Sequence, residues 1–465
     1  MKSSAVVLHL SLGVLLGFAA AAPPEAQAEI RASSKRSLGS KVNGVKGGSC
    51  NKGRCRISGG QRAGKNLFHR FRDFDTRGAI RDVRFQTGKA KNLFVGVTSP
   101  LGSFIDKRIE LSSKANVFWL SPGGMVLGSG ADFVNTPQLR LSTAGKLNFD
   151  AGQFDVFSSS ADDLALLRGE PLPGALGLQA TPQLESDAGL LPGIHLNGIN
   201  ISIDDDLLID APGGQVAVEN STLSVSAEEG VGGTLMLTGE QIEIDGNSQF
   251  LATGPEGGGL IQVGGSWQNS DPSLRQSVKA TVESGAVLDA SATDIGNGGE
   301  IVVWSDITNP YAVTSVAGSL SVEAGIAGGD GGRIETSGAD LDIAGIDVST
   351  YSPTGENGLW LLDPTDYIIG EDAATAIGSA LEGGNDVTVL VSGGNCDASY
   401  ATSSCTVGTP SGGGLTTAAG GGGDDRIKID RFINASTSAA VTLTLEAPGG
   451  VVLDDYISIK TYGSG

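Results

Sequence analysis

The sequence predicts an all-β protein, a β-solenoid with loops outside its coils, and two recurring patterns carry this prediction. The first is a glycine pair followed by alternating apolar residues, a glycine corner leading into a strand with one buried face. The second is a further alternating strand within about a dozen residues of most corners. A β-sandwich with glycine-rich turns is the alternative, but corners that recur in one register favour a solenoid. The glycine pairs are Gly213-Gly214, Gly232-Gly233, Gly258-Gly259, Gly298-Gly299, Gly331-Gly332 and Gly449-Gly450.

The composition suits the same architecture. Aromatic residues make up only 5% of the 465 residues, and 71 residues are glycine, which argues against a large aromatic core. Stacked coils need only small aliphatic residues inside, and the alternating Val, Ile, Leu and Ala supply them. Such an interior is too narrow for a cofactor, and we expect none.

The first residues predict an exported protein. Lys2 precedes an apolar run over residues 5–22, and Ala26-Gln27-Ala28 has the form of a signal-peptidase site. We therefore expect a signal peptide over residues 1–28, with cleavage between Ala28 and Glu29. A membrane anchor is the alternative, disfavoured because the run is short and ends in Pro23-Pro24.

Charge is distributed unevenly along the chain. The formal net charge is −21, yet about 20 of the 31 Lys and Arg residues lie within residues 31–114, beside about five acidic residues. Clustered basic residues are also typical of nucleic-acid binding. Export and the lack of a helix-turn-helix or base-stacking motif argue against it, so we expect no nucleic-acid partner. The rest of the chain is acidic, which favours solubility and repulsion between like charges along an elongated molecule.

Four cysteines form two local pairs, Cys50 with Cys55 and Cys396 with Cys405. In an exported chain, each pair predicts a small disulfide loop. We do not expect a zinc site, because neither pair has further Cys or His residues close in sequence to supply the remaining ligands. Free thiols remain the alternative.

Composition shifts divide the mature chain into five segments. We expect a basic, Cys-containing leader, loosely ordered apart from its Cys loop, then an aromatic-rich module with a Pro- and Gly-rich loop over residues 158–193. Regular solenoid follows, interrupted by a Gly-rich excursion with the second Cys loop, and then resumed. The strand pattern runs to the last residue without a cap, so we expect an incomplete C-terminus. The segments are residues 29–58, 59–200, 201–365, 366–425 and 426–465.

The aromatic module carries a recognisable succession of motifs. Residues 59–74 read GGQRAGKNLFHRFRDF, residues 115–128 read ANVFWLSPGGMVLG, and GADF and LSTA follow. This order resembles the N-terminal secretion domain of filamentous haemagglutinin-type exoproteins of two-partner secretion systems. Later segments, such as residues 286–292 and 298–306, resemble the repeats of large adhesins in that family. Two departures are Ser121-Pro122, where the family has Asn-Pro, and the basic leader in place of the usual first strands.

The resemblance implies a right-handed parallel β-helix on the surface of a Gram-negative-type bacterium. It implies a partner, an outer-membrane β-barrel transporter with periplasmic binding domains, and an unknown surface ligand on a host or neighbouring cell. An adhesive or surface-structural role follows. The residues that match the family's secretion and transporter-recognition motif are Asn66, Leu67, Phe68, His69, Phe71, Phe74, Asn116, Ser121, Pro122, Gly123 and Gly124.

These residues also have a purely structural interpretation, which we favour for the residues between Asn66 and Phe71. Asn66, Phe68, His69 and Phe71 fit one coil of core aromatics with a hydrogen-bonded asparagine ladder. The segment from Ser121 to Gly124 fits a turn, with Pro fixing φ and Gly permitting the reversal. The structural and export roles are compatible.

Catalytic, metal and cofactor sites have little support, and we expect a protein that is not an enzyme. His69 and His195 lie far apart and outside any nucleophile motif. The run Asp204-Asp205-Asp206 fits a solvated acidic loop better than a calcium site. A haem site is not expected, because the sequence has no local pair of residues that could bind the haem iron. The alternatives are a secreted carbohydrate-active enzyme resembling polysaccharide lyases, and the delivery stalk of a contact-dependent toxin whose active domain is missing.

One late strand gives a specific packing prediction. In residues 358–364, GLWLLDP, alternation places Leu359 and Leu361 on one face and Trp360 and Leu362 on the other. Pro364 should end the strand. We expect Trp360 to be covered by the excursion that begins near Asp366.

Overall fold

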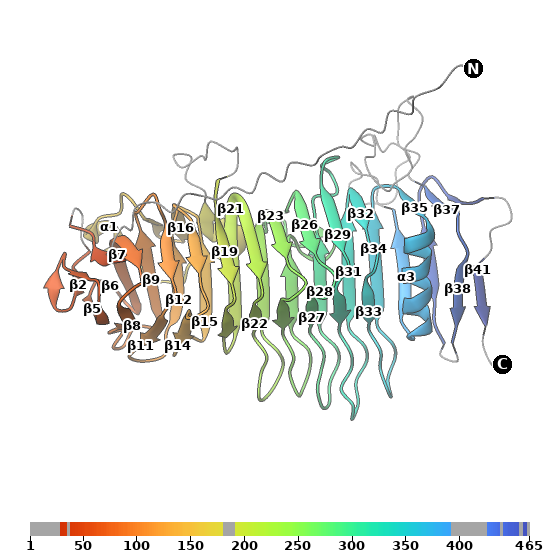
Figure 1. Ribbon diagram of the computed structural model, residues 1–465, viewed down its shortest axis with the longest axis horizontal. Helices are drawn as coiled ribbons and strands as arrows, with labels where there is room; N and C mark the ends of the chain where they lie inside the picture. The colour runs from red at the N-terminus through yellow and green to blue at the C-terminus, as the bar shows by residue number, and fades with distance from the viewer. Residues whose placement is uncertain are drawn as a thin grey trace, which may run out of the picture.

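The protein is an elongated stack of short strands, as the ribbon in Figure 1 shows. The computed structural model describes residues 28–34, 38–179, 191–391, 426–437, 440–454 and 459–462. Strands dominate these residues, so the all-β prediction is confirmed. No helix in the described ranges is long and apolar enough to cross a bilayer.

The coils build three rows of strands that run the length of the stack. Each strand in a row pairs in parallel with its counterpart one coil later, the arrangement expected of a solenoid. The first row contains β7 (Asn66–Asp75), β9 (Asn92–Val97), β12 (Asn116–Leu120), β15 (Gln138–Ser142), β21 (Asp206–Glu219), β23 (Thr234–Ile244), β25 (Leu260–Val263), β28 (Glu300–Trp304), β31 (Arg333–Gly338), β34 (Leu359–Pro364), β36 (Asp386–Leu390) and β39 (Leu443–Glu446).

The second and third rows complete each coil. The second row holds β10 (Ser103–Ile105), β13 (Met125–Leu127), β19 (Leu191–Asn197), β26 (Lys279–Val282), β29 (Val313–Val316) and β32 (Asp340–Asp342), with the later parts of β21 and β23. The third row holds β5 (Gly53–Gly59), β8 (Ile80–Phe85), β11 (Arg108–Leu111), β14 (Asp132–Val134), β20 (Asn200–Ser202), β22 (Thr222–Ser224), β24 (Gln249–Leu251), β27 (Val287–Asp289), β30 (Ser319–Ser321) and β33 (Asp347–Ser349). Inward Val, Ile and Leu from all three rows form one continuous core.

The basic leader begins the stack, which corrects the expectation of a loosely ordered segment. Its strands pair antiparallel with one another and with β7, and β5 then pairs in parallel with β8. Antiparallel strands laid across the first coil satisfy backbone groups that an open edge would expose. The leader strands are β1 (Ile30–Ala32), β2 (Ser40–Val42), β3 (Val45–Lys46), β4 (Ser49–Cys50) and β6 (Gln61–Ala63), besides β5.

Every predicted glycine pair lies at or before a strand, but most serve a different purpose from the one expected. Only Gly213 and Gly450 among them have positive φ, 69° and 92°. In the four pairs between residues 232 and 332, a Cβ would instead strike backbone of an adjacent coil, as at Gly259 against the Gly233 carbonyl. These corners need glycine because successive coils approach too closely for a side chain. They line a groove of about 820 Å³ along the stack.

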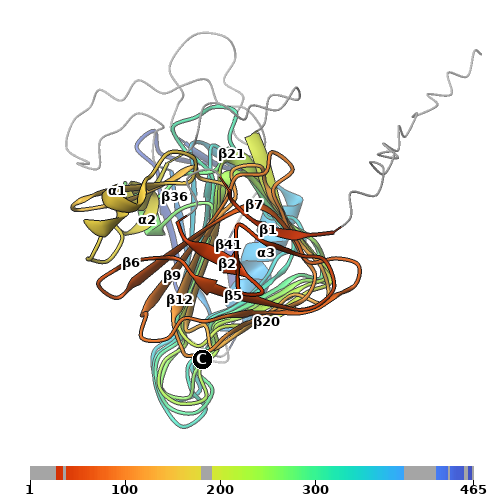
Figure 2. The ribbon, with the colours of Figure 1, turned by 90° about the vertical axis from the view of Figure 1, so that its left-hand side faces the viewer.

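One covering segment leaves the stack after β15. Residues 146–179 form β16 (Lys146–Phe149), β17 (Gly152–Asp155), α1 (Ala161–Ala165), α2 (Gly174–Gly177) and β18 (Leu178–Gln179). Figure 2 shows α1 and α2 outside the coils, beside β9 and β12. The predicted loop over residues 158–193 is thus an ordered cover where the structure describes it, and it begins earlier, at β16. A shorter excursion over residues 264–277 carries the 3-10 helix η1 (Trp267–Asn269).

The segment after residue 365 also differs from the prediction. Residues 367–390 continue the coils as β35 (Tyr367–Ile369), α3 (Glu371–Glu382) and β36, and β36 pairs in parallel with β34. Helix α3 packs between β33 and β38 (Ile433–Ser436), so a helix takes the place of one third-row strand (Figure 1). The excursion predicted over 366–425 is therefore wrong for residues 366–391, and residues 392–425 lie outside the described residues. The last described strands are β37 (Ile427–Ile429), β40 (Val451–Leu453) and β41 (Ile459–Tyr462).

The alternation predicted for β34 is confirmed. Trp360 and Leu362 are fully buried in the inner core, Leu359 and Leu361 lie on the opposite face, where Leu361 is also buried, and Pro364 is the last residue of the strand. The Trp360 indole donates to Thr336 Oγ1 at 3.1 Å. Trp360 is covered from the predicted segment, but by a regular coil rather than an excursion, because Val387 of β36 lies beside Trp360 in register.

Candidate recognition site

Three neighbouring strands place identical residues side by side on the outer face of the first coils. In β7, β9 and β12, Asn66, Asn92 and Asn116 are aligned, and two residues later Phe68, Phe94 and Phe118 are aligned. We call these six residues the Asn–Phe ladder. Because the strands are parallel and in register, identical side chains stack at the strand spacing of about 4.8 Å.

The asparagines form a hydrogen-bonded chain across the coils. The Asn92 amide donates to Asn66 Oδ1 at 2.9 Å, and the Asn116 amide donates to Asn92 Oδ1 at 3.2 Å. Asn66 and Asn92 are almost completely buried. A buried amide needs its partners, so this chain fixes the register of the first three coils.

The covering segment 146–179 closes over the ladder and binds its asparagines. Asn66 donates to the backbone carbonyls of Leu167 and Gly169 at 2.8 and 2.7 Å. Asn92 donates to the Glu170 carboxylate at 2.7 Å. The Arg70 guanidinium donates to the Asp155 carbonyl at 3.0 Å. Residues about a hundred positions apart in sequence are thereby held together.

The phenylalanines form a second core outside the coils. Phe68 stacks on Phe94 with ring centroids 4.6 Å apart, and Phe94 stacks on Phe118 at 4.7 Å. Phe149 and Phe154 of the covering segment pack against the stack, with Phe154 5.4 Å from Phe68. The surrounding apolar residues of the segment are Leu147, Val156, Leu164, Leu167 and Leu178.

The remaining residues of the predicted motif point into the coils. Leu67, Phe71 and Phe74 belong to the inner core, and His69 is fully buried beside them. The His69 ring lies 3.0 Å, Nδ1 to Oγ, from Ser40 of the leader. Burial lowers the pKa of His69 to about 3, so the ring is neutral and acts as a core residue. Along β7, Asn66 and Phe68 therefore face outward, whereas Leu67, His69, Phe71 and Phe74 face the inner core.

The segment from Ser121 to Gly124 is a turn, as predicted. The Gly124 amide donates to the Ser121 carbonyl at 2.9 Å, and the Ser121 hydroxyl donates to the Gly124 carbonyl at 2.8 Å. Gly124 has a φ of 97°, which requires glycine. Pro122 is buried, and a Cβ on Gly123 would strike the preceding coil. The turn joins β12 to β13 and offers little side-chain surface to a partner.

Comparison with known proteins decides the family. The family model described as the TPS secretion domain matches residues 37–294, more than half of the chain. The chain belongs to the two-partner-secretion exoproteins. Among solved structures, the HMW1 secretion domain from Haemophilus influenzae is similar over 67% of this chain and 95% of its own, at 17% identity and a TM-score of 0.31. No curated protein matches the chain.

Several residues of the secretion domain's ladder escaped the sequence analysis. Asn92 and Phe94 were missed, although KNLF occurs twice, at residues 65–68 and 91–94, with ANVF at residues 115–118. That repeat, at intervals of one coil, was the available signal. No repeat in the sequence indicates the roles of Glu170 and Arg70. Their hydrogen-bond partners, Asn92 and the Asp155 carbonyl, belong to distant segments.

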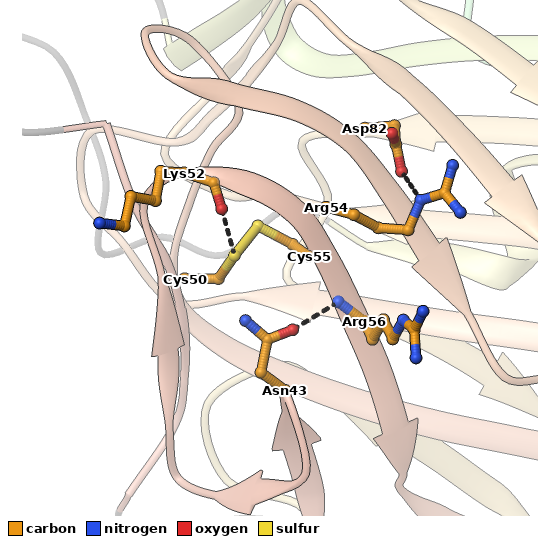
Figure 3. The surroundings of a disulfide bond; sticks show 7 residues. All are labelled: Asn43, Cys50, Lys52, Arg54, Cys55, Arg56 and Asp82. Atoms are coloured by element: carbon orange, nitrogen blue, oxygen red, sulfur yellow. Dashed lines mark hydrogen bonds and ion pairs between the residues drawn. A yellow bond between two sulfur atoms is a disulfide. The ribbon is translucent and has the colours of Figure 1, made fainter.

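The Cys50–Cys55 disulfide is confirmed and lies in the leader. Figure 3 shows it joining β4 to β5, with the two Cα atoms 5.8 Å apart. Beside it, Arg54 pairs with Asp82 of β8, and Asn43 Oδ1 accepts from the Arg56 amide at 2.9 Å. Arg108 pairs with Asp132 further along the same face at 2.9 Å. The basic leader thus joins the next coils partly through cross-strand ion pairs. Cys396 and Cys405 lie outside the described residues.

The predicted cleavage site lies where the described chain begins. Ala28 and Glu29 precede β1, and the Glu29 carbonyl accepts from the Asp75 amide of β7 at 3.1 Å. The residue expected to begin the mature chain therefore already contacts the first coil. Residues 1–27 lie outside the described residues.

The acidic run is engaged in local contacts. Asp204 pairs with Lys114 at 2.8 Å, and Asp206 accepts from Gln138 at 2.9 Å. Neighbouring carboxylates and burial raise the pKa of Asp205, with burial the larger cause. Within the described ranges there is no group of three or more His, Cys, Asp or Glu residues placed to hold a metal ion. The absence of metals and cofactors stays an expectation.

Proposed function

We propose that this exoprotein crosses the outer membrane through a β-barrel transporter whose periplasmic domains recognise its N-terminal coils. Its later coils then form a surface-exposed right-handed parallel β-helix that serves adhesion or surface structure. The observation that carries the proposal is that the family match, residues 37–294, contains the Asn–Phe ladder, its cover and most of the leader.

Burial of the ladder bears on how recognition would occur. Phe68, Phe94 and Asn92 have no exposed surface in the folded protein, so a transporter cannot touch them there. The transporter would therefore bind the motif while the chain is extended, before the first coils close. The same residues would then nucleate folding outside the cell, because each added coil buries apolar surface on the one before.

The proposal includes no catalytic activity. His69 is enclosed in the inner core. His195 is exposed on β19, in a different row and a later coil, so the two histidines do not share a site. Adhesion is the interpretation favoured by the long, regular body of short strands, which presents a mostly polar face to a surface partner. Row three illustrates this face, with Ser202, Ser224 and Ser321 pointing outward.

The test is export of a ladder variant from cells that carry the partner transporter. The double variant N66A/F68A should undergo signal cleavage at Ala28 and then fail to reach the surface, because inner-membrane passage reads only the signal. The matched control is W360A, which removes an equally buried aromatic residue from the inner core of a coil beyond the family match. Surface levels of N66A/F68A equal to wild type, or a loss of export equal to that of W360A, would contradict the proposal.

A further inference from the structure

A buried carboxylate lies on the outer face of β21, next to the covering segment. Asp210 is 2% exposed and accepts hydrogen bonds from Ser142 Oγ at 3.0 Å and Thr238 Oγ1 at 2.7 Å. Ser142 and Thr238 are its register partners in β15 and β23. Two hydroxyls do not neutralise a charge, so a carboxylate at this depth also needs a cation.

Arg275 supplies that cation from the excursion over residues 264–277. Its Nε lies 3.3 Å from Asp210 Oδ1. Its Nη2 donates to the backbone carbonyl of Leu178, in β18 of the covering segment. A single guanidinium therefore joins three elements: the coil that carries Asp210, the excursion, and the cover of the Asn–Phe ladder. The planar fork of an arginine suits this double contact, which a lysine cannot reproduce.

The two excursions also touch directly. Ser273 Oγ and Leu274 lie 3.0 and 3.3 Å from the position that a Cβ on Gly174 would occupy. Leu274 is buried at this contact. A side chain at Gly174 would press on the side chains of Ser273 and Leu274, so the two segments are in close contact.

The excursion is anchored on later coils at its other contacts. Gln276 Oε1 accepts from the Trp304 indole of β28 at 3.0 Å, and the Gln268 amide donates to Glu335 of β31 at 2.7 Å. Arg333 lies over the Trp267 ring at 4.3 Å. The excursion is thus held by residues up to 335, beyond the family match that ends at residue 294.

We propose that residues 264–277 are a clamp that belongs to the export module, and that Arg275 is its positioning residue. The clamp holds the cover against the ladder and ties both to β28 and β31. The functional unit for export then extends to about residue 338 rather than ending with the family match at residue 294. This inference rests on the proposed function for its export half, whereas its structural half stands on the contacts alone.

Hydrogen exchange of the full-length purified protein tests the structural half. In R275Q, amides of residues 146–179 should exchange at least about tenfold faster, because Asp210 loses its cation and Leu178 its donor. R275K should recover only part of the protection. D210N/R275Q should exchange more slowly than R275Q, since no buried charge is left unpaired. The matched control is K279Q, which removes an exposed ion pair with Glu243 a few residues away and should leave these amides unchanged.

Export of the same variants, measured in cells with the partner transporter, tests the other half. R275Q should reach the surface several-fold less than K279Q, and D210N/R275Q should recover part of the loss. Exchange in R275Q equal to that in K279Q would overturn the clamp. Faster exchange with unchanged export would overturn its place in the export module. Neither result depends on N66A/F68A, whose normal export would instead contradict the proposed function.

Discussion

Asn92 is the central residue of the Asn–Phe ladder, and its replacement should loosen the cover without disturbing the later coils. In N92A, Asn66 Oδ1 loses its donor in a buried site, which costs about 1–3 kcal/mol. Half-buried Asn116 loses its acceptor, about 0.5–1.5 kcal/mol, while exposed Glu170 is rehydrated. The sum is a loss of about 1.5–4.5 kcal/mol in the local stability of the cover.

Hydrogen exchange measures this loss where it occurs. A loss of about 1.5–4.5 kcal/mol corresponds to exchange about 10- to 2,000-fold faster in peptides from residues 146–179. A stack of coils does not unfold in one step, so a local readout is preferable to a single melting temperature. The matched control is N197A, because Asn197 also donates to a carboxylate one coil away, Glu219 at 2.7 Å, but is exposed. Exchange in N92A within about threefold of wild type, or equal acceleration in N197A, would refute the reasoning.

Three further predictions concern other parts of the chain. Replacing Cys50 and Cys55 together with Ser should destabilise the leader by about 2 kcal/mol, because the closed loop is short; unchanged exchange protection of β1 and β5 would contradict this. Burial raises the pKa of Glu335 to about 8 from its ordinary 4.5, so the folded state holds a proton that the unfolded chain loses, and stability should fall between pH 4.5 and 8. In E335Q this part of the pH dependence, measured by urea denaturation, should flatten; an unaltered slope would show that Glu335 is not its source. W360A should cost about 3–5 kcal/mol, since the indole fills the core between two coils; a change in the urea midpoint no larger than that of an exposed-site variant would count against this packing. The disulfide between Cys396 and Cys405 stays a prediction, and mass spectrometry of the non-reduced protein would decide it.

The recurring local patterns were enough to predict the coil architecture. Alternation in segments such as residues 359–364 correctly assigned inward and outward residues, because one buried face per strand dictates the period. The asparagine ladder was also predicted in kind, from Asn66 and its aromatic neighbours, and its hydrogen bonds are present. The second KNLF sequence would have supplied two missing residues, Asn92 and Phe94.

Long-range contacts were not predictable from local patterns. The carbonyls that bind Asn66 belong to Leu167 and Gly169, in an irregular segment whose path across the ladder no periodicity encodes. The same holds for Arg275 and Asp210, which lie on different elements. Helix α3 is a different case, since Ala373, Ile377 and Leu381 recur at helical spacing and are buried. The glycine-rich sequence downstream obscured that signal.

The glycine corners show a correct prediction made for a partly wrong reason. Glycine pairs do mark the entry to strands, as at Gly298-Gly299 before β28. Positive φ is not the cause there, because a Cβ on Gly299 would strike the Gly259 carbonyl of the preceding coil. Contact between coils is a property of the stack, which a single turn of sequence does not reveal.

The central claim is that the N-terminal unit directs export through a partner transporter, and one measurement tests it most directly. The full chain is expressed in cells with and without the transporter gene, and the fraction cleaved by external protease is measured on intact cells. The account predicts a mature protein that is accessible outside when the transporter is present and confined to the periplasm when it is absent. Equal surface accessibility in both strains would contradict it.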